Sequence, residues 1–486
     1  MRPEVLKRIL SRLLLVSAVA HTIPLLFALL AREGHWLPWL FPAALAGALG
    51  GWLARQPEVR EAPKDLRRRE GFLAVTMSWL VLVLFTSAAY LLTGEFETVA
   101  DTVFESMSGW TTTGATILDD IEGMSRPVLL MRSVSHWLGG LGIIVLSVAI
   151  LPGLAVGGMQ LFSAEATGLE ADKLAPRIAA TARRLWSLYV GLTAVLIVLL
   201  VAGGVSLWHA VNHAMSTLAT GGFSTLNRSV GGLDSLYAEI VIIVFMFLGG
   251  IGFTLHYRAI IRRNPKPLLQ SPEVRLYAAL MLAAALIIGV SLYAEGLYDS
   301  VGQVIRYAAF QTVSIMTTTG FGTADFDAWP HVARVVLVGL MLIGGCAGST
   351  AGGTKVIRLY VVSKHAILQL HRLVRPRLVA PLKVGDRPVP REATEAVLGF
   401  YLLTFAAITG GAIIVTALGM DFESGLSAAI SAVNTIGPGL GTVGATQTFY
   451  DVPAAGKYAL SFGMLLGRLE IYTVLVLFTT HFWRRG

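Results

Sequence analysis

Four short strips rich in glycine and threonine are the part of this chain best suited to chemistry. Each strip contains a glycine that we align as its pivot: Gly114, Gly221, Gly320 and Gly437. Glycine permits backbone conformations in which successive carbonyl groups point to one side, and threonine adds a hydroxyl oxygen. Such strips can replace the water shell of a dehydrated cation, as rings of carbonyls do in potassium-channel filters. The strips read WTTTGAT, LATGGFS, MTTTGFGT and NTIGPGLG, at residues 110–116, 218–224, 316–323 and 434–441.

A short helical segment precedes each strip. Each segment is about three helical turns long, whereas a helix that crosses a bilayer needs about 20 apolar residues. The C-terminal end of such a helix carries partial negative charge, which favours a cation beside it. Small residues also occur where membrane helices pack closely, but four strips at the same place in a repeat favour the cation site. The segments are VFESMSGW, AVNHAMSTL, AAFQTVSIM and SAAISAVN, which begin at residues 103, 210, 308 and 427.

Membrane-spanning helices must position these strips. Of the 486 residues, 55% are hydrophobic and 14% are charged, whereas soluble proteins have about 25% charged residues. Apolar runs such as 72–92, 185–201 and 396–418 are long enough to span a bilayer. Non-helical backbone at membrane depth must be buried in protein or line a water-filled cavity, so four strips would converge on one axis. We predict an all-α polytopic membrane protein with two N-terminal helices and four helix–pore-loop–helix repeats around one pseudo-fourfold pore, about ten spans in all.

The predicted organisation has five parts. Two leading helices and a charged linker occupy residues 1–70. Four pore units follow at residues 71–184, 185–270, 271–392 and 393–486, and the third contains a glycine-rich break in its second apolar run.

The net charge of +8 is spread over the loops between apolar runs. Basic loops remain in the cytoplasm, so both termini are predicted to be cytoplasmic, and this distribution argues against nucleic-acid binding. Acidic residues at Asp119, Asp120, Asp325 and Asp327 either concentrate cations at an entrance or are ordinary solvated charges. The basic clusters lie at residues 2–12, 64–69, 173–184, 258–266, 364–383 and 484–485.

Further glycine-rich motifs carry a resemblance to a known family. The stretch GGCAGSTAGGTK at residues 344–355 and GRLEIYT at 467–473 are the most specific, and GGLG at 139–142 and GGIG at 249–252 correspond to them in the first two units. With the four strips, the chain resembles the bacterial Trk/Ktr potassium transporters, in particular their TrkH-type subunits, over essentially its whole length. The resemblance implies potassium uptake through a gated pore in a bacterial inner membrane, with K⁺ as the permeant ion and no covalently bound cofactor.

The resemblance also assigns a selectivity filter. In this superfamily, glycine at all four pivots is associated with potassium, and serine at the first is associated with sodium. Ile436 offers a carbonyl but no hydroxyl, so the fourfold symmetry is approximate. The implied filter residues are Thr112, Thr113, Gly114 and Ala115, then Ala219, Thr220, Gly221 and Gly222, then Thr318, Thr319, Gly320 and Phe321, and finally Thr435, Ile436, Gly437 and Pro438.

The glycine-rich break in the third unit is a candidate gate. Glycines in a helix interior each cost about 1 kcal/mol relative to alanine, so a break is expected, although tight helix packing is the alternative. In the resembled family this segment obstructs permeation, and an arginine near it has an electrostatic role. Arg468, a costly charge inside an apolar span, would donate hydrogen bonds to the break or pair with a carboxylate of another unit, whereas Lys355 would extend to the membrane interface. The candidate gate residues are Gly345, Cys346, Ala347, Gly348, Ser349, Thr350, Ala351, Gly352, Gly353 and Arg468.

Other functions fit the sequence less well. The order of Thr354 and Lys355 does not match a phosphate-binding loop, and the His209–His213 pair lacks the glutamate of a zinc protease. No nucleophile–base pair supports an enzyme, so we predict none. Within transport, the alternative is a secondary potassium transporter coupled to Na⁺ or H⁺. The resemblance implies a homodimer in contact with membrane lipids, carried on a cytosolic ring of nucleotide-binding, TrkA-like subunits.

Overall fold

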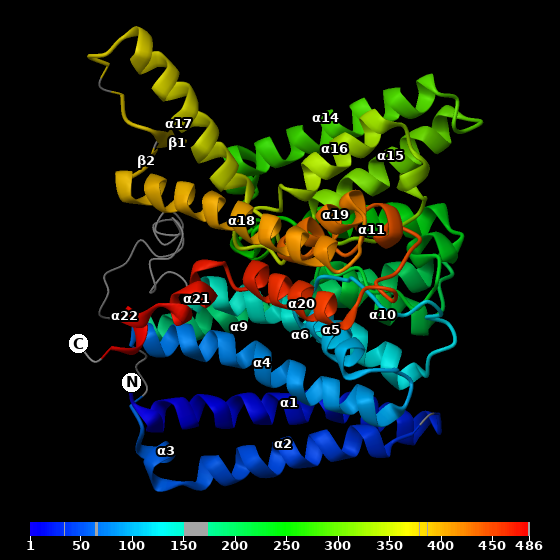
Figure 1. The fold of residues 1–486 in the computed structure, drawn as a ribbon, viewed down its shortest axis with the longest axis vertical. Coiled ribbons are helices and arrows are strands. Elements are labelled where there is room, and N and C mark those ends of the chain that lie inside the picture. The colour runs from blue at the N-terminus through cyan, green and yellow to red at the C-terminus, as the bar shows by residue number, and fades with distance from the viewer. Residues whose placement is uncertain (34, 64–66, 150–173, 379, 386, 485–486) are drawn as a thin grey trace.

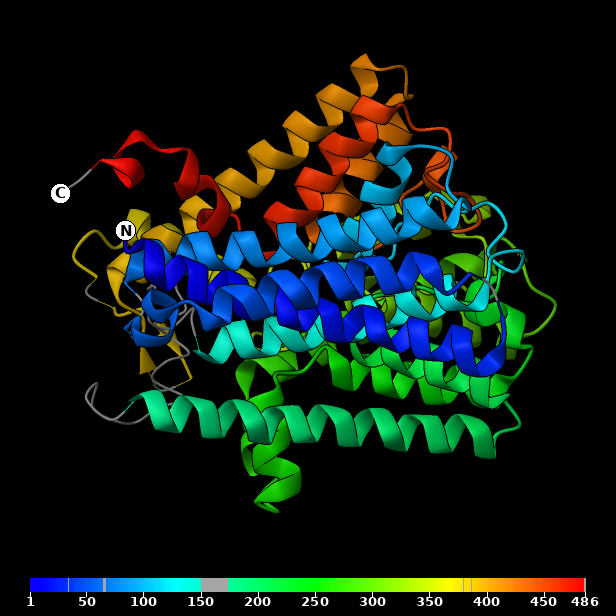
Figure 2. The same ribbon diagram turned by 90° about the horizontal axis from the view of Figure 1, so that it is seen from below.

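The computed structural model describes residues 1–33, 35–63, 67–149, 174–378, 380–385 and 387–484. Within these ranges the regular secondary structure is helical apart from one antiparallel pair of two-residue strands, β1 (Lys383–Val384) and β2 (Arg387–Pro388). Both termini lie at the same end of the molecule (Figures 1 and 2). We call this end the terminus face and the opposite end the far face. Lys173 and the loop before it lie outside the described residues.

Long apolar helices connect the two faces. Six helices of the described part are long and apolar enough to cross a membrane, or up to eight if two sharply bent pairs each count as one span. The bent pairs are α11 (Leu236–Gly249) with Phe253–Ile261, at 102°, and α20 (Ala454–Arg468) with Tyr472–Phe478, at 109°. These spans confirm the predicted helical, multi-pass class. The six are α1 (Pro3–Ala31), α2 (Leu37–Arg55), α4 (Arg68–Thr93), α9 (Leu174–Ala202), α14 (Pro272–Ala294) and α18 (Arg391–Ala417).

A repeated order of elements follows the leading pair α1 and α2. Four times, an outer helix is followed by a short helix, a non-helical strip and an inner helix. The outer helices are α4, α9, α14 and α18, and α9 begins before the boundary that we placed at residue 185. Figure 1 shows the four short helices in the half of the molecule away from the termini. The short helices are α5 (Val99–Trp110), α10 (Leu207–Leu218), α15 (Val301–Met316) and α19 (Phe422–Asn434), and the inner helices are α6 (Arg126–Ala149), α11, α16 (His331–Met341) and α20.

Each short helix begins at a capping residue. The side chains of Thr98, Ser206, Ser300 and Asp421 each accept a hydrogen bond from the backbone N–H three residues later. Such caps satisfy N–H groups that the first turn of a helix leaves without a partner. The short helices therefore start at well-defined points near the far face and direct their C-terminal ends towards the interior.

Two large clusters of buried apolar side chains form most of the core, and a third, small one joins α1, α2 and α4. One draws mainly on the first and fourth units, with Phe104 of α5 and Met464 of α20, and the other mainly on the second and third, with Phe310 of α15. Connecting segments complete the fold: α3 (Pro57–Glu61), η2 (Ser229–Leu233), α12 (Phe253–His256), η3 (Tyr257–Ile261), α13 (Lys266–Gln270), η4 (Phe326–Ala328), α17 (Val356–Val374), η5 (Gly441–Val443), α21 (Tyr472–Leu475), η6 (Val476–Phe478) and α22 (Thr480–Trp483).

Candidate ion pathway

The four strips share one backbone conformation. In each strip, a threonine with φ between 51° and 56° is followed two residues later by a glycine with φ between 76° and 113°. Positive φ is uncommon for a residue with a Cβ atom, so its recurrence identifies equivalent positions in the four units. The threonines are Thr112, Thr220, Thr318 and Thr435, and the glycines are Gly114, Gly222, Gly320 and Gly437.

The same hydrogen bond attaches each strip to its short helix. The residue between the threonine and the glycine donates its N–H to the carbonyl oxygen of a serine in the last turns of the helix, over 2.9–3.0 Å. Each of these serines stands six residues before the glycine with positive φ. The four donor–acceptor pairs are Thr113 and Ser108, Gly221 and Ser216, Thr319 and Ser314, and Ile436 and Ser431.

These positions correct our alignment of the second strip by one residue. The equivalent of Gly114 is Gly222, whereas Gly221 occupies the place of Thr113. Ala219, which we placed in the strip, is the C-cap of α10, and Phe223 takes the fourth place. Two adjacent glycines made the register ambiguous, and alignment on the preceding serine would have resolved it.

The glycines with positive φ bring the four units into one closed ring. A Cβ atom added at Gly114 would collide with the carbonyl oxygen of the middle residue of the second strip, Gly221. The same collision occurs between Gly222 and Thr319 and between Gly320 and Ile436. The circle closes because a Cβ atom at Gly437 would lie 3.0 Å from the carbonyl oxygen of Thr113. The strips therefore surround one axis in the order first, second, third, fourth.

The loop at residues 342–355, between α16 and α17, lies against these strips. We call it the intramembrane loop because the apolar runs on either side of it predict that it lies within the membrane. The N–H of Gly352 donates to Thr318 Oγ1 over 2.7 Å, and a Cβ atom added at Gly352 would collide with Thr435 Oγ1. Thr350 Oγ1 donates to the carbonyl oxygens of Leu218, at 2.9 Å, and Gly249, at 3.1 Å. The loop thus contacts the threonines of the third and fourth strips and the end of the second short helix.

Two basic side chains fix the intramembrane loop. Arg468, which is 3% exposed, donates from Nη1 to the carbonyl oxygen of Thr350 over 2.8 Å and from Nη2 to that of Gly139 over 3.2 Å. The hydrogen bond that we predicted from Arg468 to the loop is present. Lys355 donates to the carbonyl oxygens of Ala351 and Gly352, so our expectation that it extends to the membrane interface is wrong. Glu470 pairs with Arg358 of α17.

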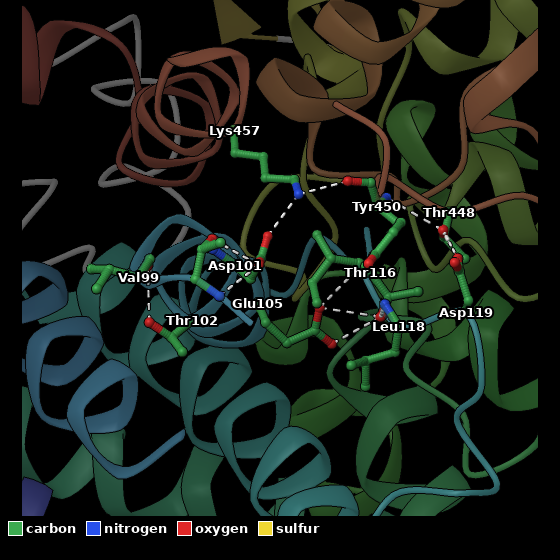
Figure 3. Close-up of polar contacts among 12 residues, drawn as sticks. Val99, Asp101, Thr102, Glu105, Thr116, Leu118, Asp119, Thr448, Tyr450 and Lys457 are labelled. Atoms are coloured by element: carbon green, nitrogen blue, oxygen red, sulfur yellow. Dashed lines mark hydrogen bonds and ion pairs between the residues drawn. The ribbon is translucent and has the colours of Figure 1, made fainter. Parts of the chain in front are cut away.

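Hydrogen bonds join neighbouring units along the far face. Between the fourth and first units, Lys457 Nζ donates to Asp101 Oδ1 over 2.6 Å, and within the fourth unit it donates to the carbonyl oxygen of Tyr450 over 2.7 Å (Figure 3). Backbone or side-chain bonds of 2.6–3.1 Å connect every pair of neighbours, which keeps the ring from spreading. The bonds run from Ile121 N–H to Asn227 Oδ1, from Gly231 N–H to the Gly322 oxygen, from Gly441 N–H to Asp327 Oδ1 and from Phe449 N–H to the Thr116 oxygen.

A buried ion pair supports the first strip from behind. Glu105 accepts from Arg132 Nε over 2.8 Å, from Thr116 Oγ1 over 3.0 Å and from the N–H of Ile117 over 3.0 Å. Figure 3 shows Glu105 reaching from α5 to the segment that follows the strip. The side chains of Glu105 and Arg132 are each at most 1% exposed. No sequence motif identified this pair, and its one signal is the presence of two charges in apolar segments.

Arg132 also contributes to a stack behind the second strip. Its guanidinium lies 4.0 Å from the ring centroid of Phe223, and the His136 ring stacks on the same phenyl group with centroids 4.1 Å apart. His136 Nδ1 is hydrogen-bonded to Ser216 Oγ at 2.9 Å, and a Cβ atom at Gly221 would collide with the imidazole. The stack therefore determines how far the second strip can move outwards.

The acidic side chains of the far face hold loops in place. Asp120 accepts from Asn227 Nδ2 over 3.0 Å, and this hydrogen bond lowers the pKa of its carboxyl group below the ordinary value. Burial raises the pKa of Asp327, which accepts from Gly441 N–H and lies 3.9 Å from Arg334 Nη2. Asp325 accepts from the N–H of Asp327, and Asp119 is hydrogen-bonded to Thr448. Asp119, Asp120 and Asp325 are exposed loop charges, Asp327 is half-buried, and a role in concentrating cations stays a prediction.

Two histidines of the second unit are hydrogen-bonded to residues at the end of the strip and just after it. His209 Nδ1 is hydrogen-bonded to Thr225 Oγ1 at 2.7 Å, and His213 Nε2 to Ser224 Oγ at 3.0 Å. The described residues contain no cluster of three or more side chains of the kinds that hold metal ions. The two imidazoles therefore fix the segment that follows the second strip.

Comparison with known proteins identifies the family. A family model described as TrkH, a cation transport protein, matches residues 48–294 and 295–484. The chain belongs to the TrkH family. It is 40% identical over 485 residues to the Trk system potassium uptake protein TrkH of Halomonas elongata and 38% identical over 482 residues to that of Escherichia coli K12, with 98% of each chain covered.

A solved TrkH structure has the same fold. The crystal structure of the potassium transporter TrkH from Vibrio parahaemolyticus superimposes with a TM-score of 0.90 at 37% identity, and the match covers 100% of both chains. The resemblance noted from the sequence motifs is thus confirmed. Membership in a cation transport family also confirms that this TrkH chain is a transporter and not an enzyme.

Proposed function

We propose that this TrkH chain takes up potassium through a gated, channel-like pore whose filter is the ring of four strips. One observation supports this proposal most strongly. The glycine with positive φ in each strip packs on a backbone carbonyl group of the next unit, and these contacts form a closed circle. The printed names of relatives, Trk system potassium uptake proteins, support potassium as the ion. Backbone oxygens around one axis are the ligands that a dehydrated K⁺ requires.

The proposed filter uses the register of the structure. It comprises Thr112–Ala115, Thr220–Phe223, Thr318–Phe321 and Thr435–Pro438, so Ala219 is replaced by Phe223 in the set that we predicted. None of these residues carries a charge. The buried hydroxyls of Thr112 and Thr435 make no hydrogen bond among the described residues, so their oxygens are available to an ion. The C-terminal ends of four short helices add negative potential at the same place.

The intramembrane loop acts as the gate in this proposal. An ion that leaves the filter towards the terminus face meets Gly352, which touches the threonines of the third and fourth strips. It also meets the positive charge of Arg468 beside Thr350. Opening requires the loop to withdraw, which breaks the bonds from Gly352 to Thr318 and from Arg468 to Thr350.

The orientation follows from charge. The linker around residues 55–70 and the segments 258–266 and 364–383 are basic, and basic loops remain in the cytoplasm. We therefore assign the terminus face to the cytoplasm of a bacterium and the far face to the outside of its inner membrane. Ions would then enter passively, driven by about 2.3 kcal/mol per charge for each 100 mV of membrane potential.

The partners are proposed from the family and from charge. The relatives' names refer to a Trk system, which implies further components. We propose a homodimer that docks a cytosolic ring of TrkA-like, nucleotide-binding subunits. The basic segments of the terminus face, 258–266 and 364–383, provide positive charge to which these subunits would dock.

Ion flux through purified protein tests the proposal against coupled transport. In liposomes with opposed K⁺ and Na⁺ gradients, the current should reverse at the potassium equilibrium potential and stay there when the Na⁺ or pH gradient is changed. A reversal potential that follows the Na⁺ or the H⁺ gradient would establish the coupled alternative. The variant Arg468→Ala should raise flux without moving the reversal potential, because it releases the loop and leaves the filter intact.

A further inference from the structure

One carboxylate of α14 holds the intramembrane loop at two points. Glu273 Oε1 accepts from the N–H of Ala347 over 2.8 Å and from the N–H of Ile357 over 3.1 Å. Ala347 lies in the first half of the loop, and Ile357 lies in the first turn of α17 directly after the loop. Glu273 is only 6% exposed. A single side-chain oxygen thus joins both arms of the loop to a helix that does not line the ring.

We propose that Glu273 is a latch that keeps the intramembrane loop in its closed position and connects it to the cytoplasmic segment 262–271. The proposal rests on the proposed function, because it takes the loop as the gate. Glu273 acts through the backbone amides of Ala347 and Ile357, so it is a positioning residue.

The latch is firmly attached to the segment that precedes α14. Ser271 caps α14 by accepting from the N–H of Val274, and Arg275 Nε donates to the carbonyl oxygen of Leu269 in α13 over 2.9 Å. The same segment carries Arg262, Arg263 and Lys266. A partner that binds these charges and moves the segment would therefore move the carboxylate away from the two amides.

Loss of the latch weakens the closed position more than an open one. Without Glu273, the N–H of Ala347 in the closed loop and that of Ile357 in α17 lose their acceptor, and a buried N–H group without a partner is unfavourable. A loop that has moved out of the pathway can satisfy these groups with water. Other bonds keep the loop folded, including Cys346 N–H to the Gly250 oxygen at 2.8 Å and Phe253 N–H to the Gly348 oxygen at 3.0 Å.

Rubidium flux into liposomes tests the latch in the full-length protein without partners. Glu273→Ala should raise flux about fivefold or more, since about 1 kcal/mol of closed-state stability corresponds to that factor. Glu273→Gln keeps an oxygen at the same place and should behave like the wild type. Glu273→Asp keeps the charge but withdraws the oxygen by one methylene, so it should also raise flux. The ratio of K⁺ to Na⁺ permeability should stay unchanged in all three.

Two further variants, Glu239→Ala and Arg468→Ala, show whether a negative result refutes the latch or the gate itself. Glu239→Ala removes another buried carboxylate from a first helical turn, but Glu239 pairs with Arg306 and is remote from the loop. If Glu239→Ala raised flux as much as Glu273→Ala, general loosening would be the cause and the latch would be wrong.

The latch would also be wrong if Glu273→Gln were as active as Glu273→Ala, or if Glu273→Ala or Glu273→Asp kept wild-type flux while Arg468→Ala raised it. If neither Arg468→Ala nor the Glu273 variants changed flux, the gate itself would be refuted. Should Glu273→Ala fail to fold, the Asp and Gln variants decide the question.

Discussion

Replacing Gly222 by alanine tests the register of the second strip. Gly222 has a φ of +85°, and a Cβ atom there would collide with the carbonyl oxygen of Thr319 in the neighbouring strip. A residue with a Cβ atom in this left-handed region costs about 1–2 kcal/mol. The strip can relieve the strain only by turning its own carbonyl groups or by displacing that of Thr319, which belong to the proposed filter.

The expected consequence is a loss of ion discrimination. If 1–2 kcal/mol of strain is released by distortion of the carbonyl ring, the preference for K⁺ over Na⁺ should fall by about 5- to 30-fold. The assay is the reversal potential of the purified variant in liposomes under opposed K⁺ and Na⁺ gradients. Gly191→Ala is the matched control, because Gly191 lies within α9 with no atom near its Cβ position, and it should leave the preference unchanged.

The adjacent glycine provides the decisive comparison. The three atoms nearest to a Cβ atom at Gly221 all belong to the imidazole of His136, and Gly221 does not have positive φ. Gly221→Ala combined with His136→Ala should therefore keep more of the potassium preference than Gly222→Ala. If Gly222→Ala kept the wild-type preference while the double variant lost it, the register and the ring argument would be refuted.

Three further predictions concern the structure around the ring. Asp101→Asn leaves Lys457 buried without its counter-charge, which should cost about 3–5 kcal/mol of stability and lower the thermal unfolding midpoint in detergent. The double variant Asp101→Asn with Lys457→Met should recover most of the lost stability. An unchanged midpoint in Asp101→Asn would contradict a stabilising role of the ion pair. Burial raises the pKa of Asp327, so the folded protein binds this proton up to a higher pH than the unfolded chain, and stability decreases as pH rises between the two pKa values. Asp327→Asn should accordingly unfold at an equal or higher temperature than the wild type at pH 7. It should lose that advantage below about pH 4, near the ordinary carboxyl pKa. If the variant were less stable than the wild type at neutral pH, the ionised carboxylate would stabilise the fold and this prediction would be wrong. Phe223→Leu removes the ring between His136 and Arg132, so it should cost about 2 kcal/mol of stability and lower potassium preference more than Phe321→Leu at the equivalent place; equal effects would argue against the stack.

The sequence reveals the helical spans and the repeat because both signals are local. Apolar runs of bilayer length predict α4 and α18 without any knowledge of the helices against which they pack. The strips recur at similar intervals, with a short helix before each. The register of the second strip was wrong because Gly221 and Gly222 are adjacent and both fit the pattern. The serine at position 216, equivalent to Ser108, contained the missing information.

Contacts between residues far apart in the chain are not visible in the sequence. Arg132 and Glu105 lie 27 positions apart, and Glu273 lies 74 positions from Ala347. Each pair lies within one unit, and its pairing depends on how the helices of that unit fold against one another, which no local pattern specifies. The glycine-rich break predicted a loop between α16 and α17, but its contact with Thr318 and Thr435 follows only from the closed ring.

Anomalous diffraction from crystals soaked in rubidium or thallium salts tests the central proposal most directly. Our account predicts ion density on the axis of the ring, beside the carbonyl oxygens of Thr113, Gly221, Thr319 and Ile436. The density should weaken or disappear in Gly222→Ala. Ordered ions bound only outside the ring, with none on its axis, would contradict the proposal that these strips form the potassium filter.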